Sequence, residues 1–78
     1  MEVKIWSTPL CAWCKKTKEF FKKHNIKYTD IDVSKDHKAA MEMIEKSGQQ
    51  GVPVIDIDGE IIIGYDEPRL KNALKIAA

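Results

Sequence analysis

The order of its strand-like and helix-like segments limits the fold of this chain more than any other feature of the sequence. Residues 2–7 alternate in polarity, with Val3 and Ile5 on one side, and predict a strand. A helical pattern follows from about residue 11 to His24, and a second strand is predicted over residues 27–33. Because a strand, a helix and a strand in succession form a right-handed crossover unit, we expect the first two strands to be parallel.

A second helix is predicted in the middle of the chain. Ser34 is a favourable N-cap residue, and the pattern after it predicts a helix that continues through Ser47 and stops at Gly48. The residues expected to pack inward from this helix are Ala40, Met41, Ile44 and, less regularly, Met43.

The last third of the chain predicts a hairpin and a final helix. Strands are expected over residues 52–57 and 60–63, and the Asp-Gly pair at 58–59 is typical of a tight turn between antiparallel strands. Asp66 is the expected N-cap of a helix over residues 67–76. The order βαβαββα therefore predicts an α/β fold, with a four-stranded mixed sheet flanked by three helices in a single domain over residues 1–78. The inward face of the last helix is predicted to carry Leu70, Ala73, Leu74 and Ala77.

Length and composition agree with one small domain and disfavour several functions. The chain has 78 residues, of which 44% are hydrophobic and 32% charged. No apolar run approaches the roughly 18 residues that a membrane span needs, so no membrane association is expected. The net charge of +1 argues against a dedicated nucleic-acid binder, which usually has a clear basic excess. The first residues lack a signal-peptide pattern, so we expect a cytoplasmic protein.

The two cysteines, Cys11 and Cys14, stand at the predicted start of the first helix. A disulfide between them would close a very small loop and constrain little of the unfolded chain, so its purpose is more chemical than structural. The free N–H groups and the dipole at a helix N-terminus favour an anion, and we therefore expect Cys11 to act as a thiolate. Cys14 lies one turn further on the same face, within reach of the Cys11 sulfur but more buried. This pair suits an exchange reaction in which Cys11 attacks a disulfide and Cys14 resolves it.

A metal site is the alternative use of two such cysteines. A zinc site needs four ligands, and the two histidines, His24 and His37, have no usual ligand spacing. The acidic residues at 56, 58 and 60 are explained by the hairpin turn. We assign no metal to a single chain. An iron–sulfur cluster or zinc ion shared between two chains is the alternative hypothesis.

Three segments resemble glutaredoxins, and especially the small glutaredoxin-like redoxins of the type that serves ribonucleotide reductase (NrdH-redoxins). These segments are residues 8–14 (Thr-Pro-Leu-Cys-Ala-Trp-Cys), 47–53 (Ser-Gly-Gln-Gln-Gly-Val-Pro) and 64–66 (Gly-Tyr-Asp), and the similarity covers essentially the whole chain. The resemblance implies the minimal thioredoxin fold. It also implies that Pro53 is a cis proline facing the dithiol and that the backbone of Val52 pairs with the substrate.

The resemblance further implies the activity and the partners. The expected function is a dithiol thiol–disulfide oxidoreductase that reduces protein disulfides or glutathione mixed disulfides, acting as a monomer without a bound cofactor. Glutathione would be a substrate or reductant. The expected catalytic residues are Cys11 and Cys14, and the expected substrate-binding residues are Trp13, Val52, Pro53, Gly64, Tyr65 and Asp66.

Departures from the usual glutaredoxin pattern leave the reductant open. Ala12 stands where glutaredoxins usually have proline, and Thr8 cannot supply the positive charge that often holds a glutathione carboxylate. Gly64 is single where many members have two glycines. An NrdH-type redoxin, reduced by thioredoxin reductase and donating electrons to ribonucleotide reductase, is therefore the alternative. A non-catalytic module with a shared cluster or zinc is the third reading.

Two further expectations concern the tryptophans and the lysines of the first helix. Trp13, between the cysteines, is expected at an exposed tip in contact with the partner or glutathione, whereas Trp6 is expected to be structural. The lysines of the first helix are expected to form a solvated face, with an acidic docking surface on a partner as the alternative. They are Lys15, Lys16, Lys18, Lys22 and Lys23.

Overall fold

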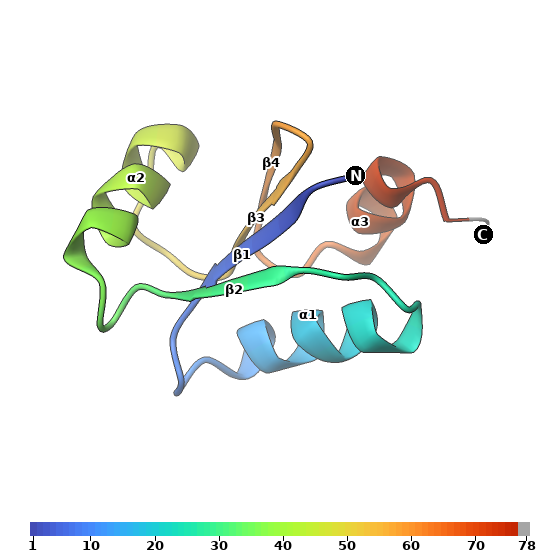
Figure 1. Ribbon diagram of the computed structural model, residues 1–78, viewed down its shortest axis with the longest axis horizontal. Helices are drawn as coiled ribbons and strands as arrows, with labels where there is room; N and C mark the ends of the chain where they lie inside the picture. The colour runs from blue at the N-terminus through green and yellow to red at the C-terminus, as the bar shows by residue number, and fades with distance from the viewer. Residues whose placement is uncertain (77–78) are drawn as a thin grey trace.

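The computed structural model describes residues 1–76 and confirms the predicted α/β architecture (Figure 1). Over these residues four strands and three helices follow one another in the expected order. They are β1 (Val3–Ser7), α1 (Ala12–Lys23), β2 (Thr29–Asp32), α2 (His37–Ser47), β3 (Val54–Ile57), β4 (Glu60–Ile63) and α3 (Glu67–Leu74).

The sheet has the order β2-β1-β3-β4, and it contains both predicted pairings, β1 with β2 and β3 with β4. β1 and β2 are parallel, because α1 connects them by a crossover. β3 is antiparallel to both β1 and β4, and the Asp-Gly turn at residues 58–59 joins β3 to β4. The carboxyl end of β1 therefore leads into a short loop and then into the start of α1, where both cysteines lie.

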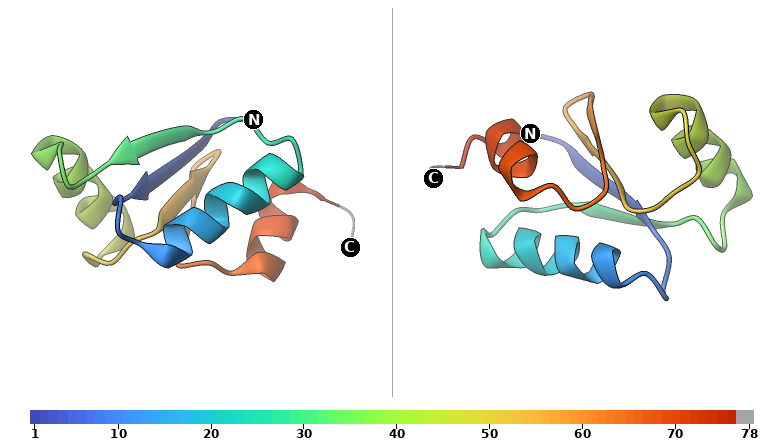
Figure 2. Two further views of the ribbon diagram at one scale, coloured as in Figure 1. Left: turned by 90° about the horizontal axis from the view of Figure 1, so that it is seen from below. Right: turned by 180° about the vertical axis from the view of Figure 1, so that it is seen from behind.

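Alternation along the strands divides the core between the two faces of the sheet. Val3 and Ile5 of β1 pack with Phe21 of α1 and Leu70 of α3. Trp6, which points to the opposite face, packs with Met43 of α2, so its expected structural role is confirmed. Figure 2 accordingly shows α1 and α3 on one side of the sheet and α2 on the other. This arrangement fixes α1, and with it the cysteines, against the sheet.

The predicted start of the second helix was wrong by two residues. Asp36 is the N-cap of α2, and its carboxylate accepts a hydrogen bond from the backbone N–H of Ala39 at 3.0 Å. Ser34 is instead bound to Asp32, whose carboxylate accepts from both the Ser34 N–H, at 2.9 Å, and its hydroxyl, at 2.6 Å. Two good N-cap residues lie close together in the sequence, and the bond to Asp32 decides which one caps the helix.

Other differences are smaller and also have local causes. Met43 is the buried methionine of α2, whereas Met41, predicted to pack, is exposed. β2 is shorter than residues 27–33, and β3 begins at Val54 rather than at residue 52, since Pro53 has no N–H to donate to a strand partner. α3 ends at Leu74 instead of residue 76. The predicted inward position at residue 77 lies outside the described residues.

The capping assignment of α2 leads to a direct prediction about stability. Asp36→Ala should lower the free energy of unfolding by about 1 kcal/mol, because it leaves a helix N-terminal N–H without its partner. Ser34→Ala is the matched control, and it should cost roughly half as much or less, since it removes an exposed bond outside the helix. Denaturant unfolding of both variants measures the difference, and equal losses would contradict the assignment.

No helix within residues 1–76 has the length and the apolar character needed to cross a bilayer.

Candidate active site

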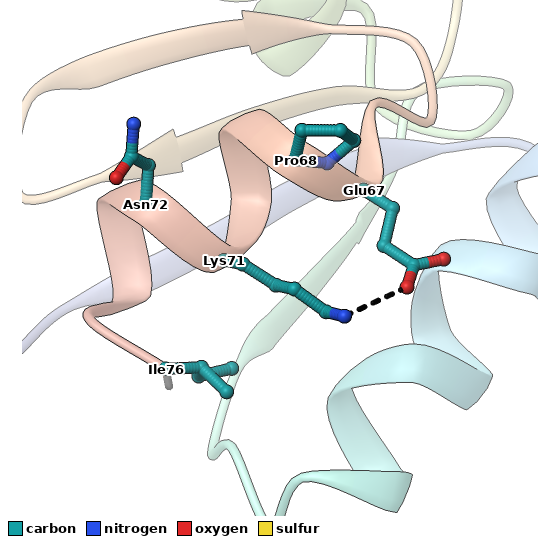
Figure 3. A pocket seen from close by; sticks show the side chains of 5 residues that line it. All are labelled: Glu67, Pro68, Lys71, Asn72 and Ile76. Carbon is teal, nitrogen blue, oxygen red and sulfur yellow. Dashed lines mark ion pairs between the residues drawn. The ribbon is translucent and has the colours of Figure 1, made fainter. Parts of the chain in front are cut away.

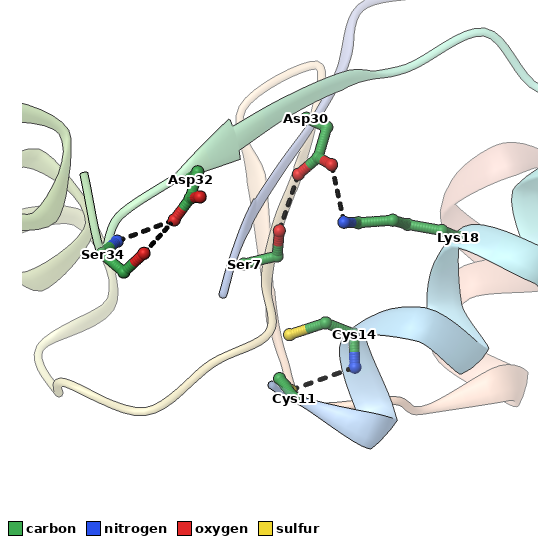
Figure 4. Close-up of polar contacts among 7 residues, drawn as sticks. All are labelled: Ser7, Cys11, Cys14, Lys18, Asp30, Asp32 and Ser34. Atoms are coloured by element: carbon green, nitrogen blue, oxygen red, sulfur yellow. Dashed lines mark hydrogen bonds and ion pairs between the residues drawn. The ribbon is translucent and has the colours of Figure 1, made fainter. Parts of the chain in front are cut away.

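Cys11 occupies the N-cap position of α1, as the sequence predicted. Its backbone carbonyl accepts from the Lys15 N–H at 3.2 Å, which begins the helix, and its Sγ accepts from the Cys14 N–H at 3.1 Å (Figure 4). A sulfur thus takes the place that the side-chain oxygen of a serine, threonine, aspartate or asparagine fills at a favourable helix N-cap. A backbone N–H is thus aimed at this sulfur, which lies at the positive end of the helix dipole.

Cys14 has the opposite environment, one turn further along the helix. Its side chain is 0% exposed, whereas Cys11 is partly exposed, and both cysteines are free thiols. Burial, together with a side-chain hydrogen bond to Cys11, raises the pKa of the Cys14 thiol to about 12. The two sulfurs are therefore unequal: one is accessible at a helix start, and the other is held protonated in the interior.

The loop before β3 lies against the dithiol. The Val52–Pro53 peptide bond is cis, and the Val52 carbonyl lies 3.9 Å from the Cys11 Sγ. Pro53 is buried, and its own carbonyl accepts from the Gly64 N–H at 2.8 Å. The structure thus brings together Cys11, Val52, Pro53 and Gly64, which are far apart in the sequence.

Aromatic side chains border the site on the side of α3. Trp13 is 57% exposed and stacks on Tyr65, with ring centroids 6.1 Å apart and an angle of 20° between the planes. The Tyr65 hydroxyl donates to the Glu67 carboxylate at 3.1 Å. The Asp66 carboxylate accepts from the Arg69 N–H at 3.2 Å, so Asp66 caps α3 as predicted. Trp13 and Tyr65 were both expected near the dithiol, but their contact with each other was not predicted.

The prediction that the lysines of α1 form a solvated face is wrong for Lys18. The Lys18 side chain is only 23% exposed, and its Nζ lies 2.6 Å from Asp30 Oδ2 on β2 (Figure 4). The other Asp30 oxygen accepts from the hydroxyl of Ser7, at 2.6 Å. Sequence reasoning missed both Ser7 and Asp30. Two features of the sequence could have indicated this ion pair. Asp30 is a charged residue inside a predicted strand, and Lys18 lies four residues after Cys14, on the same face of the helix.

The hollows on the surface do not coincide with the two sulfurs. A hollow of about 580 Å³ is lined by α3 and the residue that follows its C-cap, and neither cysteine lines it (Figure 3). A second hollow, of about 230 Å³, lies between α1 and α3 and reaches Tyr65. The chemistry of the sulfurs, and not cavity size, therefore identifies the site. The larger hollow is lined by Glu67, Pro68, Lys71, Asn72 and Ile76.

Metal-binding side chains do not gather around the dithiol. Among residues 1–76, no group of three or more histidine, cysteine, aspartate or glutamate side chains is arranged to hold a metal ion. One chain thus offers the two cysteines as ligands without a third, and a shared metal or cluster would need a second chain.

Comparison with known proteins places this geometry in a family. A glutaredoxin family model matches residues 3–62. A glutaredoxin-like 8.6 kDa protein from the rubredoxin operon of Clostridium pasteurianum is 48% identical, covering 94% of this chain and 97% of that protein. The structure of a mutant of the thioredoxin-like protein BC3987 superposes with a TM-score of 0.92 at 30% identity, over 97% of both chains. Escherichia coli NrdH-redoxin has the same fold, with a TM-score of 0.82 at 23% identity over 100% of both chains. This chain belongs to the glutaredoxin family.

Proposed function

We propose that the protein is a dithiol thiol–disulfide oxidoreductase that uses Cys11 as its nucleophile. The Cys11 thiolate attacks one sulfur of a substrate disulfide, forms a mixed disulfide and releases the other sulfur as a thiolate. Cys14 then loses its proton and attacks the Cys11 sulfur, which forms the Cys11–Cys14 disulfide. The second substrate thiolate leaves and takes up a proton. Two electrons have passed from the protein to the substrate.

The observation that carries this proposal is the inequality of the two sulfurs. Cys11 is accessible and accepts the Cys14 N–H at 3.1 Å, so its thiolate is stabilised both as an attacking group and as a leaving group. Cys14 is fully buried and protonated, so an external disulfide does not reach it first. A pair with equal exposure would carry no such division of roles.

The surroundings of Cys11 support a role in orienting an extended substrate. The Val52 backbone, beside the cis Pro53, borders the Cys11 sulfur and offers polar main-chain groups to a peptide or to glutathione. Trp13 and Tyr65 supply an apolar wall. Gly64 and Asp66 complete the border where β4 passes into α3. We assign these residues to substrate binding, with no bound cofactor, in a cytoplasmic monomer.

The reductant is either glutathione or a flavoenzyme of the thioredoxin reductase type. Thr8 supplies no charge for a glutathione carboxylate, and the Asp66 carboxylate is already engaged by the Arg69 N–H. These features favour the second candidate, an NrdH-type redoxin that donates electrons to ribonucleotide reductase. The E. coli NrdH-redoxin, which has the same fold over its whole length, is described as having a thioredoxin-like activity profile.

Paired NADPH-oxidation assays test the function and its reductant. One arm contains glutathione and glutathione reductase, and the other contains thioredoxin reductase, with the same protein disulfide as substrate in both. Turnover in either arm supports the oxidoreductase, and turnover with thioredoxin reductase alone identifies the NrdH type. No turnover in either arm, combined with stoichiometric iron or zinc in protein purified without oxygen, would contradict the proposal and favour the shared-metal module.

A further inference from the structure

The position of Lys18 sets it apart from the other lysines of α1. It lies four residues after Cys14, which places the two side chains on the same helix face with Cβ atoms about 5–6 Å apart. Its side chain is 23% exposed, whereas Lys22, one turn further, is an exposed residue. The Lys18 ammonium is therefore directed toward the sheet, on the side where Cys14 is buried (Figure 4).

Asp30 and Ser7 hold Lys18 in this position. The Lys18 Nζ lies 2.6 Å from one oxygen of Asp30, and the Ser7 hydroxyl donates to the other oxygen at 2.6 Å. Ser7 is only 1% exposed and ends β1, directly before the loop that leads to the cysteines. Two strands and the helix thus meet at Asp30, whose carboxylate anchors the Lys18 cation on the sheet-facing side of α1.

We propose that Lys18 is a positioning residue for the resolving step, in which its positive charge stabilises the Cys14 thiolate while that sulfur attacks Cys11. The inference rests on the proposed function, since it concerns the second half of that reaction. Cys14 must lose its proton in a buried place where few groups compensate a negative charge, and a nearby cation is weakly screened there.

The environment of Cys14 supports this role. The titratable and charged groups that act on Cys14 are Cys11 and Lys18, with Asp30 of β2 behind Lys18. Burial and Cys11 raise the pKa of Cys14, whereas the Thr8 backbone and Lys18 act to lower it. Lys18 is thus the side-chain cation that eases the deprotonation of Cys14.

A chromogenic disulfide separates the two steps of the reaction. Reduced protein and dithiobis(nitrobenzoate) release one coloured thiolate when Cys11 attacks and a second when Cys14 resolves the mixed disulfide. Lys18→Met should slow the second release and leave the first unchanged. Loss of the Lys18 charge should lower the fraction of Cys14 that is a thiolate, but the thiolate that remains is more basic and therefore more nucleophilic. With a Brønsted slope of about 0.4–0.5, each tenfold drop in the Cys14 thiolate fraction should slow the second release roughly three- to fourfold.

Matched variants separate an electrostatic role from a structural one. Lys18→Arg keeps the charge and should resolve at the wild-type rate, and Lys22→Met, which makes the same change of net charge on the exposed face, should also do so. In a Cys11→Ser background, Lys18→Met should shift the pH profile of Cys14 alkylation to higher pH. If Lys18 only tied α1 to β2, its loss would loosen the helix and make Cys14 alkylation faster.

The outcomes distinguish this inference from the proposed function. Two releases with an unchanged second rate in Lys18→Met, or faster Cys14 alkylation, would overturn the role of Lys18 and leave the oxidoreductase intact. A wild-type protein that forms no Cys11–Cys14 disulfide after the first release would overturn the proposed function itself.

Discussion

A Cys11→Ser variant is expected to lose all thiol–disulfide exchange activity and to keep its fold. A serine hydroxyl cannot form a mixed disulfide, and Cys14 cannot replace the lost thiolate because it is 0% exposed with a pKa raised by burial to about 12. Activity in the NADPH-coupled assay should fall to the uncatalysed background. The measurement is the initial rate for wild type and variant at equal concentration.

The choice of serine makes this experiment specific to the sulfur chemistry. Cys11 is the N-cap of α1, and serine is among the residues most favourable at that position. The start of the helix should therefore persist, and thermal unfolding should give nearly the wild-type midpoint. Residual activity above background in a folded variant would show that Cys11 is not the sole nucleophile.

A Cys14→Ser variant is expected to stop the reaction halfway. Cys11 can still attack, but no buried thiol follows, so the mixed disulfide between Cys11 and the substrate should accumulate as a stable adduct. Intact-protein mass spectrometry should show one substrate added per chain, and a reducing agent should remove it. If glutathione is the reductant, a second glutathione molecule can still release the adduct, and turnover through a monothiol route should remain.

The matched control for this variant is Cys14→Ala, because burying a hydroxyl at a fully buried position can itself cost stability. An unpartnered buried hydroxyl costs about 1–3 kcal/mol, whereas alanine introduces no polar atom. Both variants should trap the adduct, although their stabilities can differ. Failure of both to trap any adduct with a disulfide that the wild type reduces would remove Cys14 from the resolving role.

The sequence was sufficient for the element order and for the placement of Cys11. The crossover rule predicts the parallel pairing of β1 with β2, the Asp-Gly turn predicts the antiparallel pairing of β3 with β4, and both are observed. The pairing of β1 with β3, which joins the two halves of the sheet, was not specified by these rules. The start of α1 was predictable because Pro9 and the residues around it interrupt the strand pattern immediately before a helical one. Local rules of this kind act over a few residues and need no tertiary information.

Features that depend on contacts between distant segments could not be predicted. Ser34 and Asp36 are both good N-caps, and the bond from Ser34 to Asp32 selects Asp36. Similarly, Ser7 and Asp30 meet because of the register of β1 on β2, which hydrophobic pattern alone leaves unspecified. In the sequence, Lys18 cannot be distinguished from the solvent-facing lysines beside it, because its partner Asp30 is brought close only by the folding of the sheet.

The contact between Trp13 and Tyr65 has the same origin. Trp13 was expected near the dithiol because it lies between the cysteines, and Tyr65 because of the family resemblance, but their stacking depends on how α3 is placed beside α1. Both helices pack on one face of the sheet through residues such as Phe21 and Leu70. The wall of the site is therefore a consequence of core packing that lies some distance from the cysteines.

Selective alkylation of the reduced protein tests the central claim most directly. The protein is treated briefly with limiting iodoacetamide near neutral pH, and fragment ions of the peptide that contains both cysteines locate the label. The account predicts that Cys11 carries nearly all of the label while Cys14 stays almost unmodified during this brief treatment near neutral pH, because Cys14 is buried and its pKa is raised. Equal labelling of the two cysteines in the folded protein, or earlier labelling of Cys14, would contradict the division of roles on which the proposed reaction depends.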